Sequence, residues 1–153
     1  MKQICTSIEQ SQKLLELGLS PNTADMYYQR YKPKSDKIEH NPKVGNPVEA
    51  LSWYNKGYTA FNNNEPLKLE EHCIPAWSLS SLLDLVPKDI DMGTATVYHF
   101  ALWPTYDKTW MAIYETAGHY VYEMFEKETA LEAVYNMVVH LIENNYLNKE
   151  AND

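Results

Sequence analysis

Arginine is almost missing from this chain: Arg30 is the only one among 153 residues. Arginine makes the bidentate contacts with which proteins hold phosphate groups and guanine bases. The formal net charge is −8 at pH 7, whereas affinity for nucleic acid comes from clustered cations. We therefore expect no nucleic-acid partner, and acidity of this degree chiefly serves solubility.

Cysteine and long apolar runs are also scarce. Cys5 and Cys73 form no Cys-x-x-Cys pair, which favours two buried thiols in a reducing compartment over redox or metal chemistry. The first residues lack the apolar run of roughly 7–15 residues that a signal peptide needs. No window approaches the ~18 apolar residues of a membrane span. We expect a cytoplasmic protein with no membrane partner.

The local motifs of catalysis and cofactor binding are missing too. The five glycines form neither a Gly-x-Gly-x-x-Gly nor a Walker pattern, and there is no Gly-x-Ser-x-Gly elbow. No His-x-x-x-His or His-Glu-x-x-His pair supports helical zinc ligation. The carboxylates of Asp84, Asp89 and Asp91 do not have the spacing of a calcium loop. We expect no cofactor and no metal, and no single residue is marked as catalytic.

Helix boundaries are the clearest signals present, above all in the segment 74–87. Ser78 is a natural N-cap, and Pro87 prevents continuation, so a helix is predicted over 79–86. Between them, apolar residues recur with helical spacing: Leu79, Leu82, Leu83 and Val86.

Two earlier helices are predicted from similar signals. Thr6 and Glu9 have the spacing of a capping box, which starts a helix over 7–17. Asn46 followed by Pro47 starts a second helix over 47–55. Gly18 and Gly57 are expected to end these two helices.

The remaining pattern indicates an antiparallel sheet and a closing helix. Thr129 is expected to cap a helix over 130–144. Aromatic and alternating segments predict three to four strands, over 26–31, 96–103, 109–115 and 120–125. Strands packed against separate helices define a single α+β domain over residues 1–153, with a polar loop or excursion at 32–46.

Three segments of the sequence resemble those of a known family: residues 8–18, 23–28 and 74–87. They resemble a family of small uncharacterised proteins from gut bacterial genomes, often associated with prophages or other mobile elements. The helix ending in 141–144 before an aromatic residue is similar too. The family has no established activity, so the resemblance implies an accessory role in phage or host biology and no site residues.

Aromatic residues are unusually numerous, with twelve tyrosines and four tryptophans. Such residues are enriched where proteins bind one another. Trp53, Tyr54 and Tyr58 cluster in the middle of the chain, whereas Trp103 and Tyr106 border a predicted hairpin loop. These five residues are the candidate binding residues of a non-enzymatic accessory protein whose partner is another protein. The competing interpretation is that the rings cover the second face of a thin sheet.

One enzymatic alternative stays open. His99 and His119 lie on neighbouring predicted strands, and with Glu115 or Glu123 they would supply acid–base groups for a small hydrolase-like enzyme with a pocket beside the sheet. Against it stands the interpretation that these are ordinary sheet residues. An acidic mimic of nucleic acid would need regularly spaced carboxylates, and the sequence shows no such spacing. The sequence makes no prediction of oligomeric state.

Overall fold

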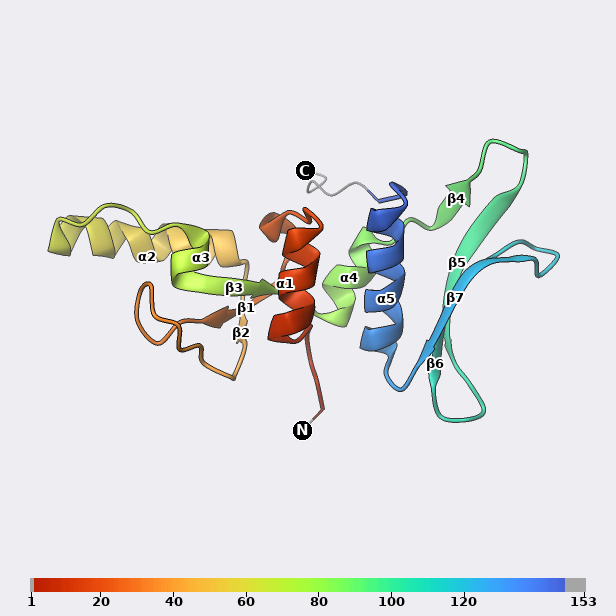
Figure 1. Cartoon of the computed structure of the whole chain (residues 1–153), viewed down its shortest axis with the longest axis horizontal. Coiled ribbons are helices and arrows are strands. Elements are labelled where there is room, and N and C mark those ends of the chain that lie inside the picture. Colours follow the sequence, from red (N-terminus) through yellow and green to blue (C-terminus); the bar gives the residue numbers. More distant parts are fainter. Residues whose placement is uncertain (1, 148–153) are drawn as a thin grey trace. The chain divides into compact units, whose positions relative to one another are not determined.

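The computed structural model describes residues 2–147, except for the side chain of Asn62 (Figure 1). These residues form five α-helices and two antiparallel sheets of three and four strands, which confirms the predicted α+β class. They divide into two compact units with a boundary between Ser78 and Leu79. The prediction of one domain did not include this division. No described helix has both the length and the apolar character needed to cross a membrane.

The first unit combines helices with a small sheet. Its elements are α1 (Ile8–Glu16), a 3-10 turn (Pro21–Thr23), β1 (Met26–Gln29), β2 (Lys43–Val44), α2 (Pro47–Asn62), α3 (Leu69–His72) and β3 (Cys73–Ala76). The strand order is β2-β1-β3, and both pairings are antiparallel.

The strand predicted over 26–31 exists, but its assignment to the main sheet is wrong. β1 ends at Gln29 and pairs with β2 and β3, two strands that were not predicted. β2 has only two residues and lies inside the polar stretch 32–46, so no alternating pattern could form. β3 contains Pro75, and proline argues against a strand when a sequence is read alone.

The start of α1 is shifted by one residue from the prediction. Ser7, not Thr6, is the N-cap: its Oγ accepts a hydrogen bond from the Gln10 N–H at 3.1 Å, and Gln10 Oε1 accepts from the Ser7 N–H. The Thr6 hydroxyl instead accepts from the Trp77 N–H at 3.0 Å. A tertiary contact has therefore taken over the side chain that local spacing assigned to the helix. Gly18 follows the helix with a φ of 90°, as predicted.

The start of α2 is confirmed, but its predicted end is wrong. The Asn46 side chain accepts from the backbone N–H groups of Val48 and Glu49, as expected of an N-cap. The helix then continues through Gly57 and ends where Asn63 takes a left-handed φ of 52°. A glycine inside a helix costs only about 1 kcal/mol relative to alanine, which the rest of the helix absorbs.

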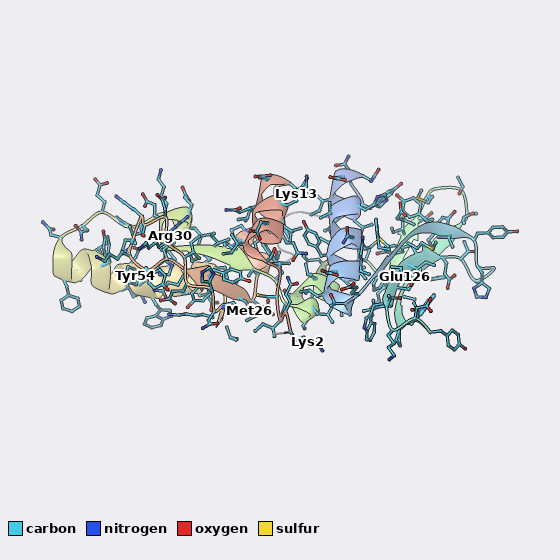
Figure 2. The ribbon with its side chains drawn as sticks, turned by 60° about the horizontal axis from the view of Figure 1, so that its bottom comes forward. Lys2, Lys13, Met26, Arg30, Tyr54 and Glu126 are labelled. Atoms are coloured by element: carbon cyan, nitrogen blue, oxygen red, sulfur yellow. The ribbon has the colours of Figure 1, made fainter. Side chains whose placement is uncertain are left out.

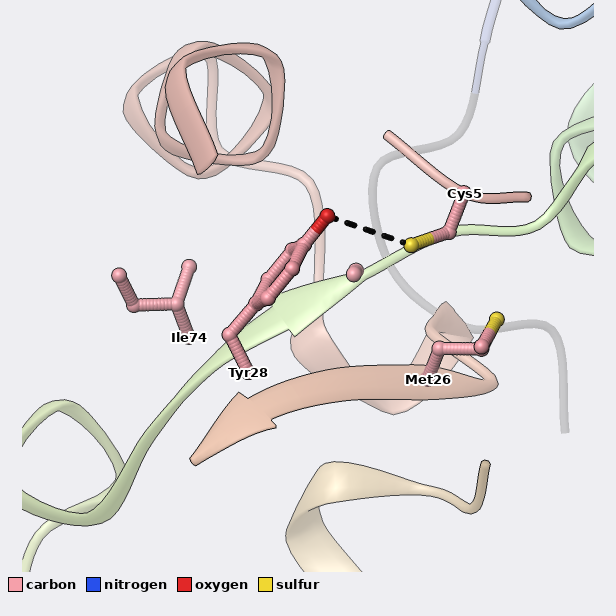
Figure 3. Packing of buried hydrophobic residues seen from close by; sticks show 5 residues of the cluster. Cys5, Met26, Tyr28 and Ile74 are labelled. Atoms are coloured by element: carbon pink, nitrogen blue, oxygen red, sulfur yellow. Dashed lines mark hydrogen bonds between the residues drawn. The ribbon is translucent and has the colours of Figure 1, made fainter. Parts of the chain in front are cut away.

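A small apolar cluster holds the sheet of the first unit together (Figure 3). The Tyr28 hydroxyl lies at its edge, where it donates to the Thr6 carbonyl at 2.9 Å and lies 3.4 Å from the Cys5 sulfur. Ile8 and Ile38 pack against the cluster. Its buried members are Cys5, Met26, Tyr28, Ile74 and Ala76.

The second unit is a four-stranded antiparallel sheet with two helices. Its elements are α4 (Leu79–Leu85), β4 (Asp89–Asp91), β5 (Val97–Pro104), β6 (Trp110–Glu115), β7 (Val121–Lys127) and α5 (Ala130–Glu143). The strand order is β4-β5-β6-β7. The strands predicted over 96–103, 109–115 and 120–125 and the helix predicted over 130–144 are all present, within one or two residues of their expected bounds. β4 was missed because three residues with aspartates at both ends give too short a pattern.

One face of this sheet, here called the inner sheet face, packs against α5. The predicted apolar stripe of α5 is buried (Leu131, Val134, Val138, Leu141 and Ile142). Phe100 and Tyr114 lie side by side on the inner sheet face with ring centroids 5.4 Å apart. The Tyr114 ring is fully buried and its hydroxyl donates to the Pro87 carbonyl.

Candidate binding surfaces

Two aromatic side chains of α2 are exposed on the same side of the helix. Trp53 is 72% exposed and Phe61 is 89% exposed, and they lie eight positions apart, about two helical turns. Gly57 lies midway between them. The Lys56 ammonium lies over the Trp53 ring, 4.1 Å from its centroid, which is a cation–π contact. Trp53, Gly57 and Phe61 thus form a continuous strip, which we call the α2 stripe.

Tyr54 and Tyr58 belong to a different part of α2. Their rings stack with centroids 5.7 Å apart, and Tyr54 also packs on His72 at 4.9 Å (Figure 2 labels Tyr54). Tyr54 is 37% exposed, about half the exposure of Trp53. The sequence did predict that Trp53, Tyr54 and Tyr58 are neighbours, but it did not separate the exposed ring from the two packed ones. It missed Phe61 because the helix was expected to end before it.

His72 is the most unusual polar group of this cluster. Its imidazole is buried between Tyr54 and Tyr27, whose ring centroid is 6.4 Å away, and its Nδ1 makes no hydrogen bond to any residue that the structure describes. Burial lowers the pKa of His72 from its usual value, and the nearby charge of Lys43 lowers the pKa further. The ring is therefore held in its neutral form. No sequence motif marked it.

In the second unit, Trp103 and Tyr106 have different surroundings. Tyr106 lies at the tip of the hairpin loop between β5 and β6 and is fully exposed. The loop is closed at its base by Thr105 and Thr109, whose hydroxyls hydrogen-bond each other. Trp103 is 38% exposed and lies on the sheet itself, directly opposite Met111 of β6.

Trp103 belongs to the face of this sheet that points away from α5, which we call the outer sheet face. Paired residues on neighbouring antiparallel strands share a face, so the register defines its members. Three rows cross the strands from β5 to β7: His99–Glu115–Val121, Ala101–Ile113–Met124 and Trp103–Met111–Glu126. β4 adds Asp89 beside His99 and Asp91 beside Val97.

The apolar centre of the outer sheet face consists of a buried isoleucine with solvent-exposed apolar side chains beside it. Val121 is 47% exposed and Met124 is 51% exposed, whereas Ile113 in the middle is buried. Val97 and Trp103 are exposed to a similar extent at opposite ends of β5. Exposed apolar side chains that share one face and are bordered by polar groups are a feature of interaction sites.

The four residues of the enzymatic hypothesis do not meet at one point. His99 lies opposite Glu115 on the outer sheet face, and His119 Nδ1 lies 3.4 Å from Glu115 Oε2. Glu123 lies on the inner sheet face, where its Oε2 is 3.7 Å from Nδ1 of His140. The structure thus brings three of the four residues together and leaves Glu123 on the other side of the sheet.

The closest partner of His99 is a residue that the sequence did not single out. Asp89 Oδ1 lies 2.5 Å from His99 Nδ1, and both side chains are more than half exposed. They border an open hollow of about 530 Å³ whose other walls include Val86 and Phe100. This is an Asp–His pair at the surface. Recognising β4, which places Asp89 opposite His99, would have revealed it.

The free edge of β7 has a feature of its own. The Glu123 carboxylate accepts a hydrogen bond from the backbone N–H of the next residue, Met124, at 2.9 Å. β7 is the last strand of the sheet, so this N–H would otherwise face outward without a partner.

The two thiols are structural. Cys5 and Cys73 are both free and buried. Burial raises the pKa of Cys73 to about 12, and burial is also the main cause of the raised pKa of Cys5. Both sulfurs therefore stay protonated near neutral pH, and neither is activated as a nucleophile. Within residues 2–147, no group of three or more His, Cys, Asp or Glu side chains is placed to hold a metal ion.

Comparison with known proteins identifies no relative. No family model matches the chain, and neither a curated protein nor a solved structure is significantly similar to it. The resemblance to the uncharacterised family of gut bacteria stays a prediction.

Proposed function

We propose that this protein is a non-enzymatic accessory protein that binds another protein through exposed aromatic side chains. The observation that carries the proposal is the α2 stripe, where Trp53 and Phe61 are 72% and 89% exposed on one helix. Fully burying a large apolar side chain contributes roughly 1.5–3 kcal/mol, which these two rings do not gain within their own fold. A partner that covers them would supply that burial.

The geometry of the stripe suits a helix that lies in a groove of its partner. Such helices present anchors one or two turns apart on a single face. Gly57 has no side chain, and the Phe61 ring lies beside it: a Cβ at position 57 would be 3.8 Å from Phe61 Cδ2. The contact between Lys56 and Trp53 favours one orientation of the indole before binding, which reduces the entropy lost on association.

The setting of this function is the cytoplasm, and the two free, buried thiols are compatible with a reducing compartment. The resemblance described above supports a phage or host protein as the partner, with a role related to a prophage or another mobile element. The negative net charge and the single arginine support a protein rather than nucleic acid.

Affinity purification from the native host tests the proposal. The wild-type chain should retain a partner that the Trp53→Ser/Phe61→Ser double variant loses, with at least a tenfold drop in recovery, because two anchors of about 1–2 kcal/mol each are removed. The matched control is Val44→Ser, which removes an apolar side chain that is 84% exposed elsewhere in the same unit. Melting curves of all three proteins verify folding. Equal recovery with the double variant, or no partner at all, would refute the proposal.

A second candidate function, a small hydrolase-like enzyme, rests on the Asp89–His99 pair and the hollow beside it. In such an enzyme His99 would act as the general base and Asp89 would orient its ring. The test is turnover of chromogenic esters, phosphodiesters and peptides by wild type, by His99→Gln and by the control His40→Gln, whose imidazole is exposed in the first unit. Activity that is absent, or equal in all three proteins, rules this candidate out.

A further inference from the structure

The outer sheet face differs from the α2 stripe in its charge. Its apolar centre is bordered by carboxylates on several sides: Asp89 and Asp91 on β4, Glu115 at one end of β6, and Glu126 on β7 (Figure 2 labels Glu126). None of the strand residues that the register places on this face is lysine or arginine. The only nitrogen bases among them are the imidazole of His99 and, beside Glu115, that of His119 in the following turn.

This border argues against a second copy of the chain as the occupant. Two outer sheet faces packed together would bring two sets of four carboxylates to one interface. Like charges in close contact at an interface cost several kcal/mol. The same border would repel nucleic acids and anionic membranes.

The border also shows which partner fits. Two lysines of this unit lie away from the outer sheet face: Lys127 is in register with Trp110 of the inner sheet face, and Lys108 is in the hairpin loop. A third, Lys88, precedes β4 and lines the hollow beside Asp89 and His99. Among the described residues, the hydrogen-bond donor to Glu126 is the neutral hydroxyl of Thr109. Asp89 and Glu115 each have an imidazole beside them, whereas Asp91 and Glu126 form no ion pair with any described residue, so cations of a partner would find acceptors there.

We infer that the outer sheet face docks a protein whose contact surface has apolar side chains at its centre and lysine or arginine side chains around them. The apolar side chains of the partner would cover the exposed parts of Met124, Val121 and Trp103. The lysine and arginine side chains of the partner would pair with the carboxylates of the border. The inference rests on the proposed function, because it names the partner chemistry for the part of the aromatic surface that contains Trp103.

Methionine-methyl NMR of the full chain tests the inference directly. Met111 and Met124 lie on the outer sheet face, whereas Met26 and Met137 are buried in the two cores and serve as internal controls. The probes are three designed peptides of equal length: one with leucine on one face and lysine around it, one with the lysines replaced by glutamate, and one with the leucines replaced by alanine. The leucine–lysine peptide should shift only the signals of Met111 and Met124, and it should bind at least tenfold more tightly than either of the others.

Charge variants supply the second arm. Glu115→Gln/Glu126→Gln keeps the shape of the outer sheet face and removes two of its charges, so the leucine–lysine peptide should bind at least fivefold more weakly. Asp36→Asn/Glu65→Gln makes the same change of net charge at exposed positions of the first unit and should bind like wild type. Unchanged Met111 and Met124 signals, equal binding of the glutamate peptide, no effect of the first pair, or dimerisation that covers this face would each overturn the inference.

The two proposals fail in different ways. The proposed function fails if no partner in the host depends on Trp53 and Phe61. The inference fails if the leucine–lysine peptide does not bind the outer sheet face, whether or not a partner binds the α2 stripe.

Discussion

His72 shows how much one side chain can depend on its surroundings. It ends the one-turn helix α3, where it is enclosed by Tyr54 and Tyr27 and has an Nδ1 without a hydrogen-bonding partner among residues 2–147. A buried polar atom without a partner costs about 1–3 kcal/mol, so this position reduces the stability of the first unit.

The lowered pKa of His72 has a consequence for stability as a function of pH. The folded state binds a proton on His72 less readily than the unfolded chain does, so protonation of His72 favours unfolding. The stability that the protein has with His72 neutral is therefore fully present above the unfolded pKa of 6.5 and is lost as the pH falls below it. We expect the free energy of unfolding to fall between pH 7 and pH 5, and His72→Phe to make this fall smaller. Urea unfolding at several pH values measures it.

The exposed His40 provides the control for this prediction. The fall in stability with pH should be reduced more by His72→Phe than by His40→Phe, because His72 is buried and His40 is exposed. A His72→Phe protein with the wild-type pH profile would show that the ring is protonated equally in both states.

At the scale of elements, the start of α2 carries more contacts than a helix cap needs. Asn46 Oδ1 accepts from two backbone N–H groups of the first turn, and its Nδ2 donates to the carbonyls of Asn22 at 3.0 Å and Ala24 at 3.3 Å. One side chain thus caps the helix and also fastens it to the turn before β1.

We expect Asn46→Ala to lower the free energy of unfolding by about 1–2 kcal/mol, the upper part of the range for loss of an N-cap. Asn46→Ser keeps an acceptor for the helix and loses the two amide contacts, so its loss should be about half as large. Urea denaturation of the three proteins measures both effects. Equal losses in the two variants would mean that the amide contacts, not the cap, stabilise this end of α2.

The sequence predicted those features of the fold that depend on contacts between residues close together in the chain. Asn46 and Thr129 each cap the helix that they were expected to cap, because the cap is a contact between residues two or three positions apart. Thr6 failed as a predicted cap because Trp77, far along the chain, takes its hydroxyl. β2 and β4 failed because short strands exist only through their pairing, which no short window of sequence contains.

The candidate sites follow the same division. That Trp53, Tyr54 and Tyr58 lie near one another could be predicted from their positions, but which ring is exposed depends on packing against α3. The Asp89–His99 pair and the carboxylate border of the outer sheet face arise from strand register, which the sequence pattern did not provide for β4.

At the scale of the whole molecule, each of the two units has a core of its own. Met26 is buried in the first unit and Met137 in the second, and contacts cluster within each unit. Composition did not mark the boundary at Ser78 and Leu79, because it falls inside the segment 74–87 that reads as one continuous helix signal.

We expect the two units to unfold as separate cooperative units, because each buries its own apolar residues. The methyl signals of Met26 and Met137 report on the two cores in the wild-type protein, so no substitution is needed. As urea increases, the two signals should lose their native positions at different midpoints. Coincident transitions under every condition would show a single cooperative fold.

The hydrogen bond from the Met124 N–H to the Glu123 carboxylate has one more effect. An open strand edge can recruit further strands and start fibril growth, and β7 is such an edge. With this donor already satisfied and an acid beside it, an incoming backbone meets a blocked position midway along β7. The same unit can therefore keep an apolar face in water while its border resists amyloid-like stacking.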